Sequence, residues 1–359
     1  MKPKETIALL LVGTLLSGIA AVAATEAGGP ANPLITLNWL KSTFIPDTVT
    51  QTGERVDEKV DQFLSAEKQG TELRVKRDDI LKLESGSTLT LLAGGGNIAG
   101  GEGHVVDTAT GEEVPGEGSN AAADHRYLAA EDTNAVFSVT SDTAVVRLTG
   151  AYQLTPSGQT DYNAIAEVLK TMGLFQGSDV PYGNGYELET APTRIQGLIM
   201  FLRLMGEEQY ALAYPGSGIT FADVPDWAER YVAYAYDKGY TKGQEIDDQW
   251  RVVFGTQDLL APRDYVTFLL RALGYSEETD FQWLTAVEDA QAVEVLTAGE
   301  VKELAEKPFL RAQVAYLSYF ALSAKTPGGE RLFERLAAGD VLDATLVDTS
   351  MSFLQKQRL

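Results

Sequence analysis

The chain has 359 residues, of which 51 are acidic and 29 are basic, so its formal net charge at pH 7 is −22. A field of this sign repels nucleic acid and anionic membrane surfaces, so neither is an expected partner. The sequence has no cysteine, which excludes disulfides and thiolate metal ligands and leaves packing as the source of stability.

The first residues have the layout of a secretory signal peptide, which we assign to residues 1–23. Lys2 and Lys4 precede an apolar run over residues 7–22, and small residues occupy most of positions 21–24. This order predicts export and cleavage, although such a run is also compatible with a marginal membrane anchor. No later segment has the ~20 apolar residues that a membrane span needs. The mature protein is therefore expected to be secreted.

The next part of the chain changes its periodicity twice. Apolar residues spaced by three and four predict an amphipathic helical segment over residues 24–72, interrupted at Pro46 and Gly53. Short runs rich in Val, Leu, Thr and Tyr, separated by glycine clusters, then predict strands over residues 73–154, arranged as a small β-sandwich or barrel. The polar stretch 155–160 predicts a linker.

The remaining chain has helical periodicity and an internal repeat over residues 161–345. The segment 173–177, Gly-Leu-Phe-Gln-Gly, corresponds to the segment 239–243, Gly-Tyr-Thr-Lys-Gly. Two further segments, 200–206 and 268–274, also match each other, and a third, weaker copy follows. Each copy predicts two helices with a turn and an irregular segment between them, and three copies are needed to share one core. The copies span approximately residues 161–210, 219–276 and 281–325, and residues 346–359 are left as a C-terminal tail.

The second copy resembles the opening of an S-layer homology (SLH) repeat. Its segment 221–228, Phe-Ala-Asp-Val-Pro-Asp-Trp-Ala, has the Phe-x-Asp-Val start and a tryptophan, and Gly239 and Gly243 follow as the Gly-x-x-x-Gly turn. With the repeats, the resemblance covers about half of the chain. The segment Leu34–Phe44 and the glycine-rich strand region are also similar to modules that precede such repeats in clostridial (Firmicutes) surface proteins.

The resemblance implies a fold and a function. The implied fold class is α+β multidomain, a β-sandwich or barrel-like module followed by an all-α, pseudo-threefold domain of SLH repeats. Grooves between such repeats bind secondary cell wall polysaccharide, often pyruvylated, and so hold a protein non-covalently on the bacterial cell wall or in an S-layer. Expected partners are therefore this polysaccharide, glycan associated with peptidoglycan, and further copies of the chain in a surface layer.

The second helix of an SLH repeat begins with a Thr-Arg-Ala-Glu-like motif. The first copy has Thr-Arg-Ile-Gln at 193–196 and the third has Leu-Arg-Ala-Gln at 310–313, so both keep the arginine. In the second copy, Pro262 takes the arginine position and Asp264 the acidic one. The resulting candidate ligand-binding residues are Arg194, Arg311, Arg263, Asp223, Trp227, Gln196 and Gln313.

Each candidate also has a purely structural interpretation. An arginine at a helix start can grip a carboxylate, such as that of a pyruvyl ketal, with two parallel donors, but Arg194 could instead pair with a nearby Asp or Glu. Gln196 fits a capping box with Thr193. Asp223 fits a helix cap better than a contact to sugar hydroxyls, and Trp227 on a helix is more commonly a core residue than a stacking platform.

No catalytic residue, metal site or cofactor is predicted. The two histidines, His104 and His125, have no cysteine or third histidine beside them, and the glycines of residues 94–103 lack the Gly-Lys-Ser/Thr ending of a phosphate loop. An alternative function keeps the SLH anchor but has the β-rich module bind or hydrolyse a carbohydrate or peptide. A third interpretation makes the repeats a structural helical core only.

Overall fold

The computed structural model describes residues 70–101, 103–130, 133–177, 185–216, 218–219 and 221–359. The predicted signal peptide, 1–23, and nearly all of the helical segment 24–72 lie outside the described residues. The chain divides into two compact units, residues 1–71 and 72–359, and the following description concerns the second. Among the described residues, no helix is long and apolar enough to cross a lipid bilayer.

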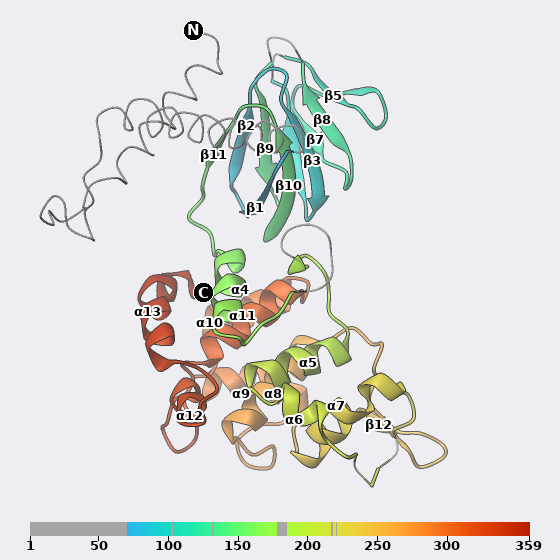
Figure 1. The fold of residues 1–359 in the computed structure, drawn as a ribbon, viewed down its shortest axis with the longest axis vertical. Coiled ribbons are helices and arrows are strands. Elements are labelled where there is room, and N and C mark those ends of the chain that lie inside the picture. The colour runs from blue at the N-terminus through green and yellow to red at the C-terminus, as the bar shows by residue number, and fades with distance from the viewer. Residues whose placement is uncertain (1–69, 102, 131–132, 178–184, 217, 220) are drawn as a thin grey trace, which may run out of the picture. The chain divides into compact units, whose positions relative to one another are not determined.

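Two β-sheets form the first part of this unit (Figure 1). The six strands of one sheet are, in spatial order, β1 (Thr71–Lys76), β10 (Thr143–Thr149), β3 (Thr88–Ala93), β8 (Arg126–Ala129), β5 (Val105–Asp107) and β6 (Glu112–Val114). The five strands of the other are β11 (Tyr152–Thr155), β2 (Ile80–Leu83), β9 (Ala135–Val139), β4 (Gly96–Ala99) and β7 (Ser119–Asn120). All pairs whose register is described are antiparallel.

The two sheets share one apolar core. Alternate residues point inward in several of the strands, as in β9, where Ala135, Phe137 and Val139 are buried. Leu89 from the first sheet and Leu81 from the second belong to the same hydrophobic cluster as these residues. Burial of one face of each sheet against the other explains why alternating apolar residues occur throughout this part of the sequence.

Helices make up most of the second part, from α4 onward (Figure 1). They are α4 (Tyr162–Thr171), α5 (Arg194–Leu204), α6 (Glu208–Leu212), α7 (Asp226–Asp237), α8 (Pro262–Leu273), α9 (Ala286–Ala292), α10 (Ala298–Glu306), α11 (Arg311–Ala321), α12 (Leu332–Ala338) and α13 (Ala344–Leu354). A short hairpin, β12 (Glu245–Ile246) and β13 (Val252–Val253), and two 3-10 turns, η3 (Trp283–Thr285) and η4 (Gln355–Gln357), complete the described elements. A second apolar cluster runs through these helices. The α+β composition predicted from the sequence is thereby confirmed.

A common turn follows the first helix of each sequence copy. The residue at the turn has a left-handed backbone in all three, with φ of 76° at Gly173, 76° at Gly239 and 61° at Glu294. The next residue then donates to a helix carbonyl five positions earlier, in Leu174 N to Leu169 O, Tyr240 N to Ala235 O and Val295 N to Ala290 O, each at 2.8 Å. The third copy uses glutamate where the others use glycine, which explains why its sequence match is weak.

Two predicted boundary segments differ in the structure. Residues 346–359, predicted as a tail, form most of α13 and all of η4, because Val347, Met351 and Leu354 recur at helical spacing and pack on the helical core. The stretch 155–160, predicted as a linker, is hydrogen-bonded to neighbouring elements at two positions. Ser157 N donates to Asp79 Oδ1 at 2.7 Å, and Thr160 Oγ1 donates to the Gln357 carbonyl at 3.1 Å.

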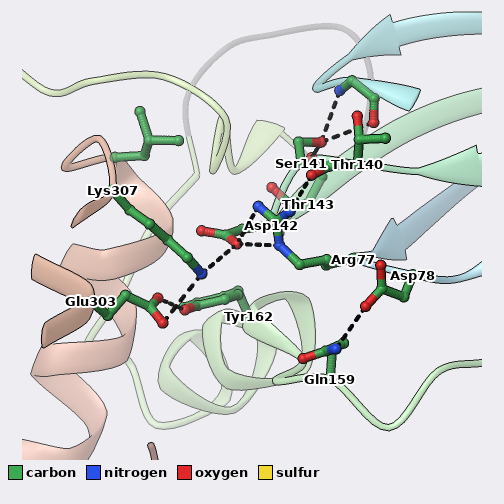
Figure 2. A network of polar contacts seen from close by, with 12 residues as sticks. Arg77, Asp78, Thr140, Ser141, Asp142, Thr143, Gln159, Tyr162, Glu303 and Lys307 are labelled. Carbon is green, nitrogen blue, oxygen red and sulfur yellow. Dashed lines mark hydrogen bonds and ion pairs between the residues drawn. The ribbon is translucent and has the colours of Figure 1, made fainter. Parts of the chain in front are cut away.

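A buried polar network joins the sheets to the helices (Figure 2). Its centre is Asp142, in the turn between β9 and β10, which is 7% exposed. Asp142 Oδ1 accepts from Arg77 Nε and from Lys307 Nζ, each at 3.0 Å, and its Oδ2 accepts from Gln313 Nε2 at 2.8 Å. One carboxylate from the β part is therefore bound by two helical-part donors.

Candidate functional site

A groove of about 160 Å³ lies where the first and second copies meet. The start of α5, the turn after α7, the helix α8 and the 3-10 turn η3 supply its walls. Its charged and aromatic lining comprises Arg194, Lys242, Arg271, Asp264, Glu277 and Trp283. Three cations therefore face two carboxylates, which makes the lining positive in a chain of net charge −22.

Backbone contacts between the two copies place Arg194 in this groove. Thr193 caps α5 by accepting from Gln196 N, and Gln196 Oε1 accepts from Thr193 N at 2.9 Å, so the predicted capping box is confirmed. The backbone N of Arg194, the next residue, donates to the Asp258 carbonyl at 2.8 Å. The first turn of α5 is thus held against the loop that precedes α8.

The Arg194 side chain is buried and only partly satisfied. It is 4% exposed, and its Nη1 lies 2.8 Å from Asp264 Oδ2. The predicted alternative of a structural ion pair is therefore present. The contact is an ion pair rather than an aligned hydrogen bond, since Arg194 Nε and Nη1 have no hydrogen-bond acceptor among the described residues. A buried guanidinium with unused donors is unusual, because unpaired buried donors cost free energy.

The other charges of the groove hold one another in place. Asp264 Oδ1 accepts from Trp283 Nε1 at 2.9 Å. Glu277 pairs with Lys242 at 2.7 Å and with Arg271 at 2.6 Å. Burial raises the pKa of Glu277, but the hydrogen bonds and charges of these two cations lower it by more. The pKa of Glu277 therefore lies below its ordinary value. Both carboxylates of the groove are therefore engaged with donors.

The third copy repeats the arginine arrangement against the first. Arg311 N donates to the Thr190 carbonyl at 2.9 Å, as Arg194 N does to Asp258, and Arg311 Nε donates to the Tyr186 carbonyl at 3.0 Å. Burial lowers the pKa of Arg311, against the opposing charge of Glu187. The Arg311 side chain is buried, with the residue 7% exposed. It is thus a second buried cation at a boundary between copies.

The turn of the first copy has its own hollow, of about 410 Å³. Its walls include Phe175 and Gln176 from the turn, and Arg203 and Glu208, whose Nε and Oε2 are 2.7 Å apart. Arg203 and Glu208 pair near the end of the second helix, as Arg271 and Glu277 do in the groove. The same pairing therefore occurs at equivalent places in two copies.

Arg263 lies in a different setting, because Pro262 occupies the first position of α8. Its guanidinium is 4.1 Å from the centre of the Trp283 ring and lines a separate hollow of about 330 Å³. That hollow also contains Leu284, Val287 and Leu304. Where the second copy meets the third, the surface is thus largely apolar, and among the described residues the second copy has no buried arginine there.

The remaining predicted residues do not meet in the groove. Gln313 Oε1 accepts from Leu310 N at 3.0 Å and its amide is bound to Asp142, so the side chain is fully engaged. The expectation that Asp223 caps α7 is wrong, because Pro225 is the N-cap and Asp223 binds a loop instead. The expectation that Trp227 is a core residue is also wrong, since it is 59% exposed.

Sequence reasoning missed four groove residues, Lys242, Arg271, Glu277 and Trp283, and assigned no partner to Asp264. Lys242 stands inside the repeated glycine turn, and Arg271 stands inside the repeated segment 268–274, so both were visible as matched positions. Glu277 lies outside the matched segments, and Trp283 stands at the start of the third, weaker copy, where sequence reasoning assigned it no role in a site. Only the fold brings them to the groove.

Comparisons with known proteins give little further information. No family model matches the chain, and no curated protein does. Among solved structures, procruciferin, an 11S globulin from Brassica napus, is 10% identical over 23% of this chain and 21% of its own, with a TM-score of 0.17. The coconut allergen cocosin is 10% identical and pumpkin seed globulin 6% identical, each over 28% of this chain and 27% of its own, with TM-scores of 0.16. Likenesses this weak carry no argument about fold or function.

Proposed function

We propose that the helical part of this chain binds an acidic polysaccharide of the bacterial cell wall through the groove at Arg194. By this proposal it is an SLH-type protein that anchors itself non-covalently to secondary cell wall polysaccharide at the cell surface. The SLH resemblance and the predicted signal peptide are the reasons for placing it at the cell wall. The groove supplies the chemistry.

The observation that carries the proposal is the buried and only partly satisfied guanidinium of Arg194. A guanidinium edge presents two parallel N–H donors that match the two oxygens of a carboxylate. Arg194 Nε is buried and has no acceptor among the described residues, and Nη1 contacts Asp264 Oδ2 at 2.8 Å without an aligned hydrogen bond. A pyruvyl ketal would bring a carboxylate into the groove, where Lys242 and Arg271 add positive charge.

The same groove argues for binding rather than catalysis. Hydrolysis of a glycosidic bond needs one carboxyl group that is protonated near neutral pH. Glu277 has a lowered pKa, and Asp264 is fixed between Arg194 and Trp283. Glu277 is therefore held in its ionised form, which cannot donate that proton. Within the described ranges, no group of three or more histidine, aspartate or glutamate side chains is arranged to hold a metal ion.

The test is co-sedimentation of the full chain with wall sacculi, before and after extraction of their secondary polysaccharide. Arg194→Lys keeps the charge but loses the paired donors, so we expect binding to weaken about tenfold or more. Arg147→Lys on the exposed side of β10 is the matched control and should bind like the wild type. Circular dichroism checks that each variant is folded. Wild-type protein that stays in the supernatant with unextracted sacculi would overturn the proposal.

A further inference from the structure

An exposed tryptophan stands at the tip of the hairpin β12–β13, whose base adjoins the groove. Trp250 is 88% exposed, more than any other large apolar side chain among the described residues. Tryptophan normally buries most of its large apolar surface in a folded protein. An indole held in solvent is therefore a feature that needs an explanation.

The hairpin turn holds Trp250 in a defined position. Asp247 Oδ1 accepts from Gln249 N at 2.9 Å and from Arg251 N at 2.8 Å, and Trp250 N donates to the Asp247 carbonyl at 3.0 Å. The Arg251 guanidinium pairs with Asp247 Oδ2 at 2.7 Å. Trp250 itself has a φ of 62°, which is uncommon for a bulky residue. The turn thus presents the ring outward in spite of a conformational cost.

The base of this hairpin is continuous with the groove. Gly243 lines the groove, and an added Cβ there would lie 2.3 Å from Val252 Cγ1, so the groove turn packs directly on β13. Gln244, the next lining residue, donates from its backbone N to the Val253 carbonyl at 2.8 Å. A polymer that leaves the groove past Gly243 and Gln244 therefore meets the hairpin next.

The hairpin differs from the groove in charge. The hairpin has three acidic residues, Glu245, Asp247 and Asp248, and one cation, Arg251. Its net negative charge therefore disfavours binding of a second acidic sugar there. The flat, apolar face of an indole is suited to the C–H face of a sugar ring. The chemistry of the hairpin therefore fits an uncharged sugar.

We propose that Trp250 is a stacking platform for an uncharged sugar unit of the same polysaccharide whose acidic unit occupies the groove. This inference rests on the proposed function and extends it to a second contact outside the groove. It assigns different sugars to the two places, a carboxylate-bearing one to Arg194 and a neutral one to Trp250.

The test is isothermal titration of the full chain with secondary polysaccharide released from sacculi. Trp250→Ala should weaken binding about tenfold, by loss of one aromatic contact, whereas Trp250→Tyr should retain most of the affinity. Ile246→Ala removes an exposed apolar side chain from the same hairpin and should bind like the wild type. After mild acid removes the pyruvyl groups, the Trp250→Ala effect should persist and the Arg194→Lys effect should disappear.

The outcomes separate the two proposals. If the wild type binds and Trp250→Ala binds equally well, the stacking inference is overturned and the groove proposal stands. If the wild type does not bind at all, both are overturned. If Trp250→Ala leaves binding unchanged but turns an oligomer into a monomer in sedimentation velocity, Trp250 is a contact between copies and the sugar assignment is wrong.

Discussion

Asp223 binds the loop of residues 254–256. This loop leads to Asp258, whose carbonyl accepts a hydrogen bond from Arg194 N in the groove. Its Oδ1 accepts from Phe254 N, and its Oδ2 accepts from Gly255 N and Thr256 N, all at 2.7 Å. Burial raises the pKa of Asp223, but these backbone donors together lower it by more. The pKa of Asp223 therefore falls below the ordinary value of 3.8. Because Asp258, just beyond this loop, accepts from Arg194 N, the residue acts on the groove through the backbone.

Asp223→Asn should destabilise the protein in a pH-dependent way. A carboxylate whose pKa is lower when folded adds stability above its unfolded pKa, and that stability is lost as the pH falls through the folded pKa. We expect a loss of about 1 kcal/mol at pH 7, since the group is largely solvated. Thermal unfolding followed by circular dichroism at pH 7 and pH 3 should show the difference between variant and wild type shrinking at the lower pH. An equal difference at both values would contradict this account.

At this scale, the sequence predicted the groove in part. Arg194 was found because a motif and a repeat both marked it, and its capping residues Thr193 and Gln196 follow a local rule. Asp223 was assigned to the wrong donors, because the loop that it binds lies about thirty residues further along the chain. Trp227 was misplaced because helical spacing alone does not show which face a neighbouring element covers.

Among the elements, the glycine turn after α7 connects the groove to the hairpin. Gly239 and Gly243 both have left-handed backbones, with φ of 76° and 80°. An added Cβ at Gly239 meets nothing within 4 Å, whereas one at Gly243 overlaps Val252 Cγ1 at 2.3 Å and Val253 O at 2.9 Å. The two glycines are therefore needed for different reasons, the first for backbone freedom and the second also for space.

This pair offers an internally controlled substitution. Gly239→Ala should cost about 1–2 kcal/mol from the left-handed backbone alone. Gly243→Ala carries the same strain and in addition about 1–3 kcal/mol from overlap with the hairpin. Urea unfolding of both variants measures the difference. Equal losses would show that the turn and β13 are not packed as described.

Element types were easier to predict than element ends. Period-two and period-four apolar patterns identified the strands and most helices because each is a local signal. The third copy was weak in sequence because Glu294 replaces the turn glycine, yet its backbone follows the same path. The C-terminal helix α13 was missed although Val347, Met351 and Leu354 carry a helical pattern, because the segment falls after the last recognisable repeat.

At the scale of the whole molecule, Asp142 joins the two parts. Its partner Lys307 is 165 residues away in sequence and Gln313 is 171 residues away. No periodicity or motif links positions this distant, so the contact could not be predicted from the sequence. Breaking a buried charge network by removing one partner leaves the others unsatisfied and is strongly destabilising.

Asp142→Ala should therefore uncouple the β part from the helices. We expect a loss of about 3 kcal/mol and the replacement of one calorimetric unfolding transition by two, since Arg77, Lys307 and Gln313 would lose their common acceptor. Glu84→Ala, at an exposed turn between β2 and β3, should keep a single transition. Two transitions already in the wild type would show that the network does not couple the parts.

The contacts of residues 155–160 affect where a protease can cut this protein. A protease must draw several consecutive residues into its cleft, so it cuts where the backbone is free of contacts. Ser157 and Thr160 both bind neighbouring elements, so this polar, linker-like sequence is a poor place to cut. Proteolytic release of the β part from the helices would therefore need a cut elsewhere in the chain, or first the loss of the contacts around Asp142.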